Sequence, residues 1–342
     1  MQGDALSTKR QIMNSSPSSS PPCFTHGLRI DRSWTDPAEM SQLAAYWRIE
    51  QTQLTAGKYV GHIRGLHTRA MQLGWCEHSR GTRISGFVPA GSVVLAFCLP
   101  SRFPTSFCGR RLESREMMIV HDGEEFVILH SGATKVLSVA IDQAWANEIA
   151  HSQGYDSFHR FLSSSCVASV TTAGFVKTGR CLWDLLAVAF LSDPTFIDEA
   201  EAHDFECRLL EALFSEIHDQ AHPQTDSDRR QQAKKAENYL REHMREPLDL
   251  MALCRELGTP SRTVQYGFRE TYGLSMKSYA QALRFNGAHR DLSNADPVED
   301  SVKAVALSWG FRHLGRFATD YHKWFGQCPR ATLSSARTCH RS

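Results

Sequence analysis

The last third of this 342-residue chain carries one residue pattern twice, and this duplication constrains the fold more than any other feature. The first copy is "CRELGTPSRTVQYGFRETYG" at 254–273, and the second is "ALSWGFRHLGRFATDYHKWFG" at 306–326. Each copy has a small residue, a glycine four positions later, two large apolar residues four apart, and a closing glycine: Cys254, Gly258, Val264, Phe268 and Gly273 in the first, and Ala306, Gly310, Phe317, Tyr321 and Gly326 in the second. The second copy has one extra residue in the turn.

This spacing predicts two tandem helix-turn-helix units. The small residue lets two helices cross closely, the first glycine ends one helix in the left-handed conformation, and the apolar pair anchors the next helix. In the first copy we expect Thr259 to cap the second helix and Pro260 to occupy its first turn. The second copy has no Ser or Asp at the corresponding position, because Arg312, His313 and Gly315 occupy the turn.

The outward faces of the two second helices are the candidate binding surface. We expect Val264 and Phe268 to face inward in the first copy, and Leu314, Phe317, Tyr321 and Trp324 or Phe325 in the second. The opposite faces hold side chains that donate to phosphates or to guanine edges. The predicted DNA-binding residues are Arg262, Gln265, Tyr266, Arg269, Arg312, His313, Arg316, Thr319 and Lys323. An ordinary solvated helix face is the alternative, and whether Arg312 and His313 contact bases or only start the helix is left open.

A helical segment joins the two copies. "SMKSYAQALRFNGAHRDLSN" at 275–294 has twenty residues, which span roughly 30 Å at ~1.5 Å per residue. This length is close to the ~34 Å between successive major-groove faces of B-DNA. The joining helix would therefore place both second helices on one side of a duplex. Gly287 is its expected weak point, because glycine in a helix interior is about 1 kcal/mol less favourable than alanine.

Charge is distributed unevenly along the chain. Residues 228–342 hold 19 Lys and Arg against 12 Asp and Glu, and the totals of 38 and 37 leave 19 against 25 for residues 1–227. A basic C-terminal third indicates an anionic partner for that region, although chance variation in surface charge is an alternative.

The preceding part of the chain has the pattern of short strands and then of a helix. Residues 92–98, 116–120, 125–129 and 135–141 read as strands, with a tight turn at Asp122-Gly123, and such a series predicts a small sandwich or barrel. An apolar stripe along 204–220, through Phe205, Leu209, Leu213 and Ile217, predicts an amphipathic helix.

The N-terminal segment, the longest apolar stretch and the cysteines indicate in which cellular compartment the protein is expected. The Ser/Pro-rich residues 1–22 are expected to form a disordered tail, and they lack the apolar run of a signal peptide. The longest apolar stretch, 182–191, contains Asp184 and is too short to cross a bilayer. Ten scattered cysteines without a C-x-x-C pair favour reduced thiols. We therefore expect a cytoplasmic protein without a membrane-spanning segment.

Residues from about 231 to 335 resemble the DNA-binding domain of the AraC/XylS transcriptional regulators. The resemblance rests on Gly310-Phe311, the aromatic residues Phe317 and Tyr321, and "FGQCP" at 325–329. The "HLGRF" turn is most similar to the branch that contains ethanolamine-operon regulators. The resemblance implies an α+β chain with a cupin-like β-barrel sensor domain with helices at 23–221, a linker at 222–228, and an all-α domain at 229–342 with two helix-turn-helix units joined by a linker helix. It also implies a homodimer contact at 204–220, activation through RNA polymerase, and a small-molecule effector whose identity the sequence does not reveal.

The expected function is that of a sequence-specific transcriptional regulator that binds double-stranded promoter DNA, without catalytic residues, cofactor or metal. One alternative is a cupin-like module that binds a protein and no longer binds DNA. The other is a cupin enzyme with a DNA-binding tail, but G-x-S-x-G, P-loop and G-x-G-x-x-G motifs are absent from the sequence. The nearest metal-ligand candidates, His121, Glu124 and His130, are interpreted as ordinary residues. Trp75, Phe87 and Phe97 are candidate pocket residues that are more typical of core.

Overall fold

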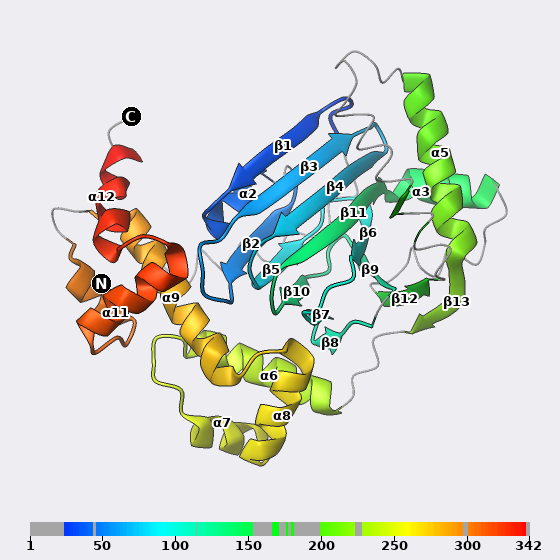
Figure 1. The fold of residues 1–342 in the computed structure, drawn as a ribbon. Coiled ribbons are helices and arrows are strands. Elements are labelled where there is room, and N and C mark those ends of the chain that lie inside the picture. Colours follow the sequence, from blue (N-terminus) through cyan, green and yellow to red (C-terminus); the bar gives the residue numbers. More distant parts are fainter. Residues whose placement is uncertain are drawn as a thin grey trace, which may run out of the picture.

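The chain folds into a sheet-rich N-terminal region and a helical C-terminal region (Figure 1). This computed structural model describes residues 24–339 except for 44–45, 114, 153–165, 171–175, 177–178, 181–198, 223–227 and 297–299. The predicted tail at 1–22 and the apolar stretch at 182–191 lie outside the described residues. Within the described part of the chain, no helix combines the length and the apolar character needed to cross a bilayer.

The described strands of the N-terminal region form two antiparallel sheets. The first sheet has the spatial order β1 (Arg29–Trp34), β3 (Gly61–His67), β4 (Met71–His78), β11 (Thr134–Asp142), β6 (Ser92–Cys98), β9 (Glu116–His121), β12 (Cys166–Val170) and β13 (Ile217–His222). The second has the order β2 (Arg48–Gln53), β5 (Thr82–Phe87), β10 (Phe126–His130), β7 (Thr105–Phe107) and β8 (Arg110–Arg111). The cupin-like barrel is therefore not closed among these strands.

The four predicted strands are confirmed, as β6, β9, β10 and β11, with shifts of at most one residue at their ends. The Asp122-Gly123 turn follows β9, and Gly123 has a φ of 82°, a conformation that glycine adopts without strain. This turn joins strands of different sheets, because β9 pairs with β6 and β12 whereas β10 pairs with β5 and β7. The chain therefore changes sheets at this turn.

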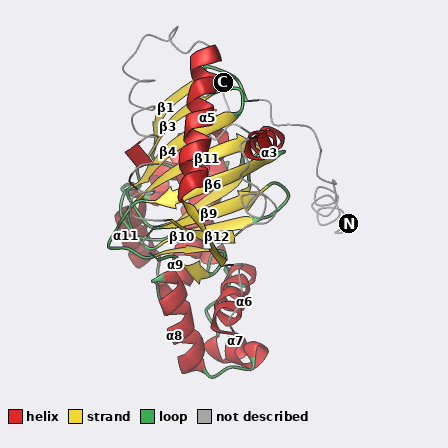
Figure 2. Cartoon of the chain, turned by 90° about the vertical axis from the view of Figure 1, so that its right-hand side faces the viewer, coloured by secondary structure: helices red, strands yellow, loops and turns green. Residues whose placement is uncertain are grey.

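Both faces of the first sheet pack against other elements of the chain. Its inner face packs against the second sheet through large side chains such as Trp34, Met118 and Ile128. Its outer face is covered by α3 (Gln143–Ser152) and α5 (Glu199–Glu216), as Figure 2 shows. The short helices η2 (Pro37–Glu39) and α2 (Met40–Leu43) precede β2.

The helix predicted at 204–220 begins earlier and ends earlier in the structure. It is α5, which ends at Glu216, and Ile217–His222 continue as β13 beside β12. Phe205, Leu209 and Leu210 are buried against the outer face of the first sheet. This part of the apolar stripe is therefore used within the chain, and the predicted dimer contact stays a prediction.

The described residues of the C-terminal region form seven helices: α6 (Asp228–Glu242), α7 (Leu250–Leu257), α8 (Ser261–Tyr272), α9 (Met276–Asn294), α10 (Val302–Ser308), α11 (Leu314–Phe325) and α12 (Pro329–Cys339). Two helix-turn-helix units, α7–α8 and α10–α11, lie on either side of α9, which occupies the predicted joining segment (Figure 1). Their apolar faces share one core, and Leu54 and Leu129 of the N-terminal region belong to it.

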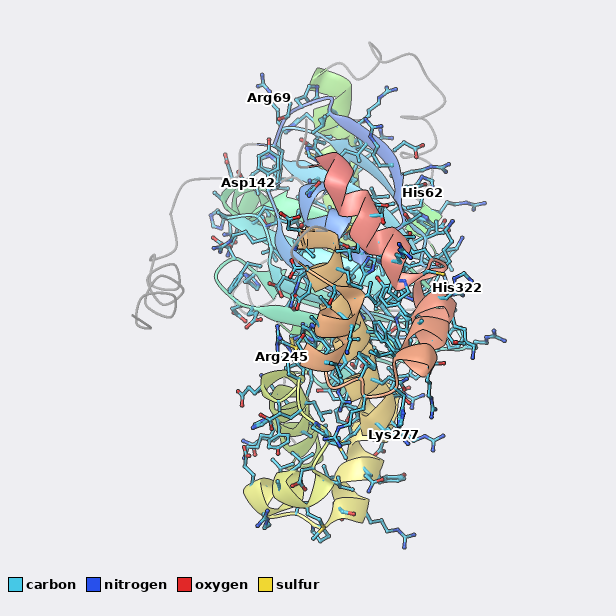
Figure 3. The ribbon with its side chains drawn as sticks, turned by 90° about the vertical axis from the view of Figure 1, so that its left-hand side faces the viewer. His62, Arg69, Asp142, Arg245, Lys277 and His322 are labelled. Carbon is cyan, nitrogen blue, oxygen red and sulfur yellow. The ribbon has the colours of Figure 1, made fainter. Side chains whose placement is uncertain are left out.

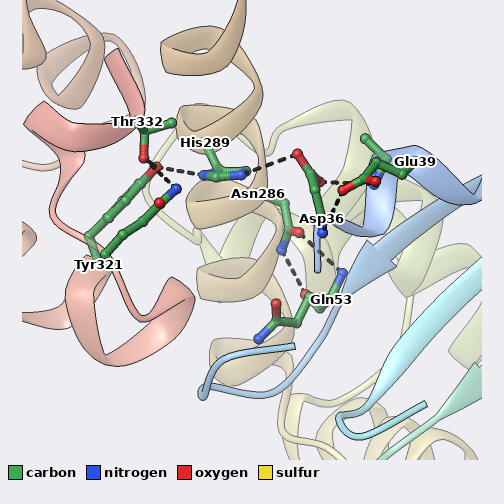
Figure 4. Close-up of polar contacts among 9 residues, drawn as sticks. Asp36, Glu39, Gln53, Asn286, His289, Tyr321 and Thr332 are labelled. Carbon is green, nitrogen blue, oxygen red and sulfur yellow. Dashed lines mark hydrogen bonds and ion pairs between the residues drawn. The ribbon is translucent and has the colours of Figure 1, made fainter. Parts of the chain in front are cut away.

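Polar contacts also join the two regions. In Figure 4, Asn286 of α9 pairs with the backbone of Gln53: Gln53 N donates to Asn286 Oδ1 at 3.1 Å, and Asn286 Nδ2 donates to Gln53 O at 2.6 Å. One turn further along α9, His289 Nε2 lies 3.4 Å from Asp36 Oδ2, and its Nδ1 lies 2.6 Å from the hydroxyl of Tyr321. The joining helix is thus held against β2 and against the second helix-turn-helix unit.

Candidate nucleic-acid interface

The first helix-turn-helix unit has a left-handed glycine at its turn. Gly258 ends α7 with a φ of 60°, and its backbone N–H donates to carbonyls of that helix. Val264 and Phe268 are buried, as predicted. The predicted cap is wrong: Pro260 is the N-cap residue of α8, and the hydroxyl of Thr259 donates to Leu257 O at 3.0 Å instead. The Thr259 hydroxyl therefore bonds to the end of α7 rather than to the start of α8.

The second unit repeats this geometry with one difference. Gly310 follows α10 with a φ of 76°, and α11 buries its side chains Phe317, Tyr321 and Trp324. His313 is the N-cap residue of α11 and makes no side-chain cap bond. The inward prediction for Leu314 is wrong, since this side chain is 36% exposed.

The exposed faces of α8 and α11 open onto one groove of about 980 Å³, to which α9 also contributes. Six of the nine predicted binding residues line it: Gln265, Tyr266, Arg269, Arg312, His313 and Arg316. Arg262, Thr319 and Lys323 are outside its lining, although all three are exposed. Tyr266 is 63% exposed, which is unusual for a ring of this size and leaves its hydroxyl and face open to a partner.

The joining helix contributes three long polar or charged side chains to the groove, and the sequence interpretation missed them. Lys277, Gln281 and Arg284 of α9 line the groove between the two units, and Lys277 is labelled on this helix in Figure 3. Arg284 Nη2 donates to Glu246 O at 2.9 Å, and burial lowers the pKa of its guanidinium, which an arginine nevertheless keeps protonated. Their spacing of four and three residues is that of one helix face, and this periodicity was the available signal.

One carboxylate adjoins the cations of α11. Asp320 Oδ2 lies 3.5 Å from Arg316 Nε, and its Oδ1 lies 3.6 Å from Lys323 Nζ. The side chains of Arg316 and Lys323 are 82% and 68% exposed, so each pair contributes well under ~1 kcal/mol to stability. These cations can therefore leave Asp320 for a stronger anionic partner at little cost.

The joining helix sets the distance between the two units. Its 19 residues span about 28 Å at ~1.5 Å per residue. Gly287, the predicted weak point of this helix, makes room for Trp309, because a Cβ at this position would lie 2.0 Å from the Trp309 ring. Glycine here lets α10 approach α9, and the indole N–H of Trp309 donates to Asp291 Oδ2 of α9 at 2.7 Å. The second unit is thus fixed to the helix that also carries the first.

The metal-ligand candidates from the sequence, His121 and His130, are not part of the lining of this groove. Among the described residues, no group of three or more His, Cys, Asp or Glu side chains is placed to hold a metal ion. His130 is 1% exposed and its Nδ1 lies 2.9 Å from Thr105 Oγ1, and His121 is also buried. The groove can accordingly bind an anion through arginine, lysine and amide donors.

Known proteins share sequence with this region. The family description "Helix-turn-helix domain" matches residues 253–335. The "Probable thc operon regulatory protein" of Rhodococcus erythropolis is 36% identical over 98 residues, which are 29% of this chain and 30% of the relative. The "XylDLEGF operon transcriptional activator 2" of Pseudomonas putida is 30% identical over 96 residues, 28% of this chain and 61% of the relative.

The solved structure of a probable AraC family transcriptional regulator from Rhodopseudomonas palustris is 33% identical and covers 31% of this chain and 97% of that chain, with a TM-score of 0.29. All three similarities are confined to about a third of this chain. The chain spans 30% and 61% of the length of the two curated relatives above.

The fold and these matches define the C-terminal region as a helix-turn-helix domain with two units. Through this region the chain belongs to the AraC/XylS family of transcriptional regulators. The narrower resemblance to ethanolamine-operon regulators stays a prediction, since the relatives above carry other operon names.

Proposed function

We propose that this chain is a sequence-specific DNA-binding regulator that activates transcription from the promoters it binds. The observation that carries this proposal is the single groove onto which both α8 and α11 present cationic and amide donors. The names of relatives such as the XylDLEGF operon activator support the same function. Neither the proposal nor those relatives assign an enzymatic activity to the chain.

In the proposed complex, α8 and α11 each enter a major groove. Arg269 of α8 and Arg316 of α11 line the groove of the protein. The guanidinium of each can bind guanine edges or phosphates with two parallel hydrogen bonds. Lys277 and Arg284 lie between the helices, in a position to neutralise the intervening phosphates. Because such contacts release condensed counterions, affinity should fall steeply as salt rises.

The rest of the chain supplies regulation in this proposal. Residues 23–221 form the sensor domain, 222–228 the linker and 229–342 the DNA-binding domain, within the cytoplasm. A small molecule bound by the sensor domain would change DNA binding through contacts such as Asn286 with Gln53. A homodimer and a contact with RNA polymerase are further expectations from the family.

Selection from a pool of random double-stranded DNA tests the proposal without a known promoter. Purified full-length protein is expected to enrich duplexes with two conserved blocks about one helical turn, ~10 base pairs, apart. Arg269→Ala should relax preference in one block and Arg316→Ala in the other, each by about 1–3 kcal/mol at the contacted position.

Arg290→Ala is the matched control, because Arg290 is exposed on α9 but lies outside the groove. This variant should enrich the same duplexes as the unaltered protein. A pool that shows no enrichment with any of these proteins would refute DNA binding and support a protein-interaction module instead.

A further inference from the structure

A second site lies between the two sheets of the N-terminal region. A cavity of about 100 Å³ is lined there by apolar side chains from both sheets, including Ile63, Val94, Ile128 and Val136. Gly65, Gly74 and Ala96 also line it, and their small size leaves the space that larger residues would fill. Trp75, Phe87 and Phe97, the pocket candidates from the sequence, are not in this lining.

One wall of the cavity carries a hydrogen-bond donor that lacks an acceptor. The indole N–H of Trp47 donates to Gln72 Oε1 at 2.6 Å, which fixes the orientation of the amide. Gln72 Nε2 must then donate to His67 Nε2, at 2.6 Å. With Nε2 accepting, the neutral imidazole carries its proton on Nδ1.

This Nδ1–H of His67 is buried and has no hydrogen-bond partner among the described residues, and the whole side chain is 1% exposed. Burial lowers the pKa of His67 to about 4, so the ring is neutral near pH 7. Leaving a buried donor unpaired costs about 1–3 kcal/mol. Such a group in a cavity wall indicates a ligand that brings the missing acceptor.

Two more histidines line the cavity elsewhere. The hydroxyl of Tyr59 lies 2.7 Å from His78 Nδ1, and Thr105 Oγ1 lies 2.9 Å from His130 Nδ1. The Nε2 atoms of both rings are buried without a partner among the described residues. His78 is six residues from Gln72 on β4, about 20 Å along an extended strand, so this pair is separate from His67.

The lining excludes ions as ligands. Its described residues include no arginine, lysine, aspartate or glutamate, and a charge transferred into such a site without a partner is strongly destabilised. The volume is below the roughly 150 Å³ of an apolar cavity that holds benzene. A ligand must therefore be uncharged, mostly apolar, and smaller than benzene.

We propose that this cavity binds a small uncharged molecule with an apolar body and one oxygen acceptor, which receives the Nδ1–H of His67. The role of that molecule as effector rests on the proposed function, but its binding does not. β2 connects the two sites, because Ile49 lines the cavity and Gln53, four residues further, pairs with Asn286 of α9.

Isothermal titration calorimetry of the full-length protein with four probes smaller than benzene tests this site. 2-Butanone is expected to bind with one-to-one stoichiometry and about tenfold more tightly than 2-methylbutane, which lacks an acceptor, as one net hydrogen bond predicts. The ions sec-butylammonium and propanoate should not bind. Saturable binding of either ion, or no saturable binding of 2-butanone, would overturn the proposal.

Two variants locate the binding. His67→Leu removes the donor with little change of volume, and it should abolish the preference for 2-butanone while 2-methylbutane still binds. Ala96→Leu fills the cavity and should abolish binding of both. Wild-type affinity for 2-butanone in both variants would place its binding site elsewhere and overturn the proposal.

DNA binding of both variants to a selected duplex is measured in parallel and should be unchanged without ligand. This measurement reports whether each variant is folded. It also separates a failure of the cavity proposal from a failure of the proposed function, because DNA binding is assayed independently of the probes.

Discussion

Replacing Glu237 should strongly destabilise the contact between the two regions of the chain. This carboxylate on α6 is 5% exposed and accepts three hydrogen bonds: from Arg83 Nε at 2.6 Å, from the Tyr272 hydroxyl at 3.0 Å and from the Tyr279 hydroxyl at 2.9 Å. Arg83 lies on β5 of the second sheet, so the ion pair joins the sheets to the helical domain. Burial, and then the Glu237 charge, raise the pKa of both tyrosines, which therefore remain neutral donors.

The expected loss of stability follows from the unpaired buried charge that the substitution leaves. Glu237→Ala would leave the Arg83 guanidinium, 4% exposed, without its counter-charge, and removing one partner of a buried pair costs about 3–5 kcal/mol. Replacing both partners with apolar residues avoids this penalty. Glu237 also accepts from the hydroxyls of Tyr272 and Tyr279, so the compensated variant combines Arg83→Met and Glu237→Met with Tyr272→Phe and Tyr279→Phe. It should lie within about 1 kcal/mol of the unaltered chain, because a buried ion pair is often no better than a hydrophobic pair.

Urea denaturation followed by circular dichroism measures the free energy of unfolding of each variant. Glu242→Ala is the control, since Glu242 lies on the same helix and is exposed, and it should change stability by no more than about 0.5 kcal/mol. If Glu237→Ala loses less than about 1 kcal/mol, the buried pair does not join the two regions in solution, and the reasoning fails.

Two further predictions concern the cores. Phe317→Ala should destabilise the helical domain by about 3–5 kcal/mol, because Phe317 is 2% exposed and packs on Phe311 at a ring distance of 4.7 Å. The control Leu314→Ala, on the same helix, should cost under about 1 kcal/mol. Equal losses of stability in thermal unfolding would contradict the assignment of the buried and exposed faces of α11. Lowering the pH from 7.5 to 5 should lower the urea midpoint, because burial lowers the pKa of His78 to about 4 and the unfolded chain takes up this proton near pH 6.5. The stabilisation is complete above about pH 6.5 and is lost as the pH falls toward 4, about 2 kcal/mol for this histidine at pH 5. His78→Gln should reduce that loss, and a midpoint independent of pH in the unaltered chain would refute the burial argument.

The helix-turn-helix units could be predicted from the sequence because their determinants are local. A glycine at a left-handed turn and apolar residues four apart act within one or two helical turns, and Gly258, Gly310, Phe268 and Phe317 have the predicted conformation or burial. The error at Leu314 has a local origin as well. This residue starts α11, so no preceding turn of the helix carries it into the core.

Other features depend on contacts between distant parts of the chain. Glu237 and Arg83 are 154 residues apart, and neither residue signals its partner. The groove also depends on Trp309 packing over Gly287, which fixes α10 against α9, the helix that carries Lys277 and Arg284. The end of α5 at Glu216 follows from pairing of β13 with β12. Periodicity identifies a helix face, but the fold decides what that face contacts.

The salt dependence of DNA binding tests the central claim most directly. Fluorescence anisotropy of a selected duplex, titrated with full-length protein at several salt concentrations, gives the slope of log affinity against log salt. The groove predicts a steep negative slope and weaker binding by Arg316→Ala and Arg269→Ala. The slope of each variant should be shallower by about one for every phosphate that its missing guanidinium would have neutralised, and Arg290→Ala should behave as the unaltered protein. A slope near zero, or equal binding by all four proteins, would contradict the assignment of this groove to DNA.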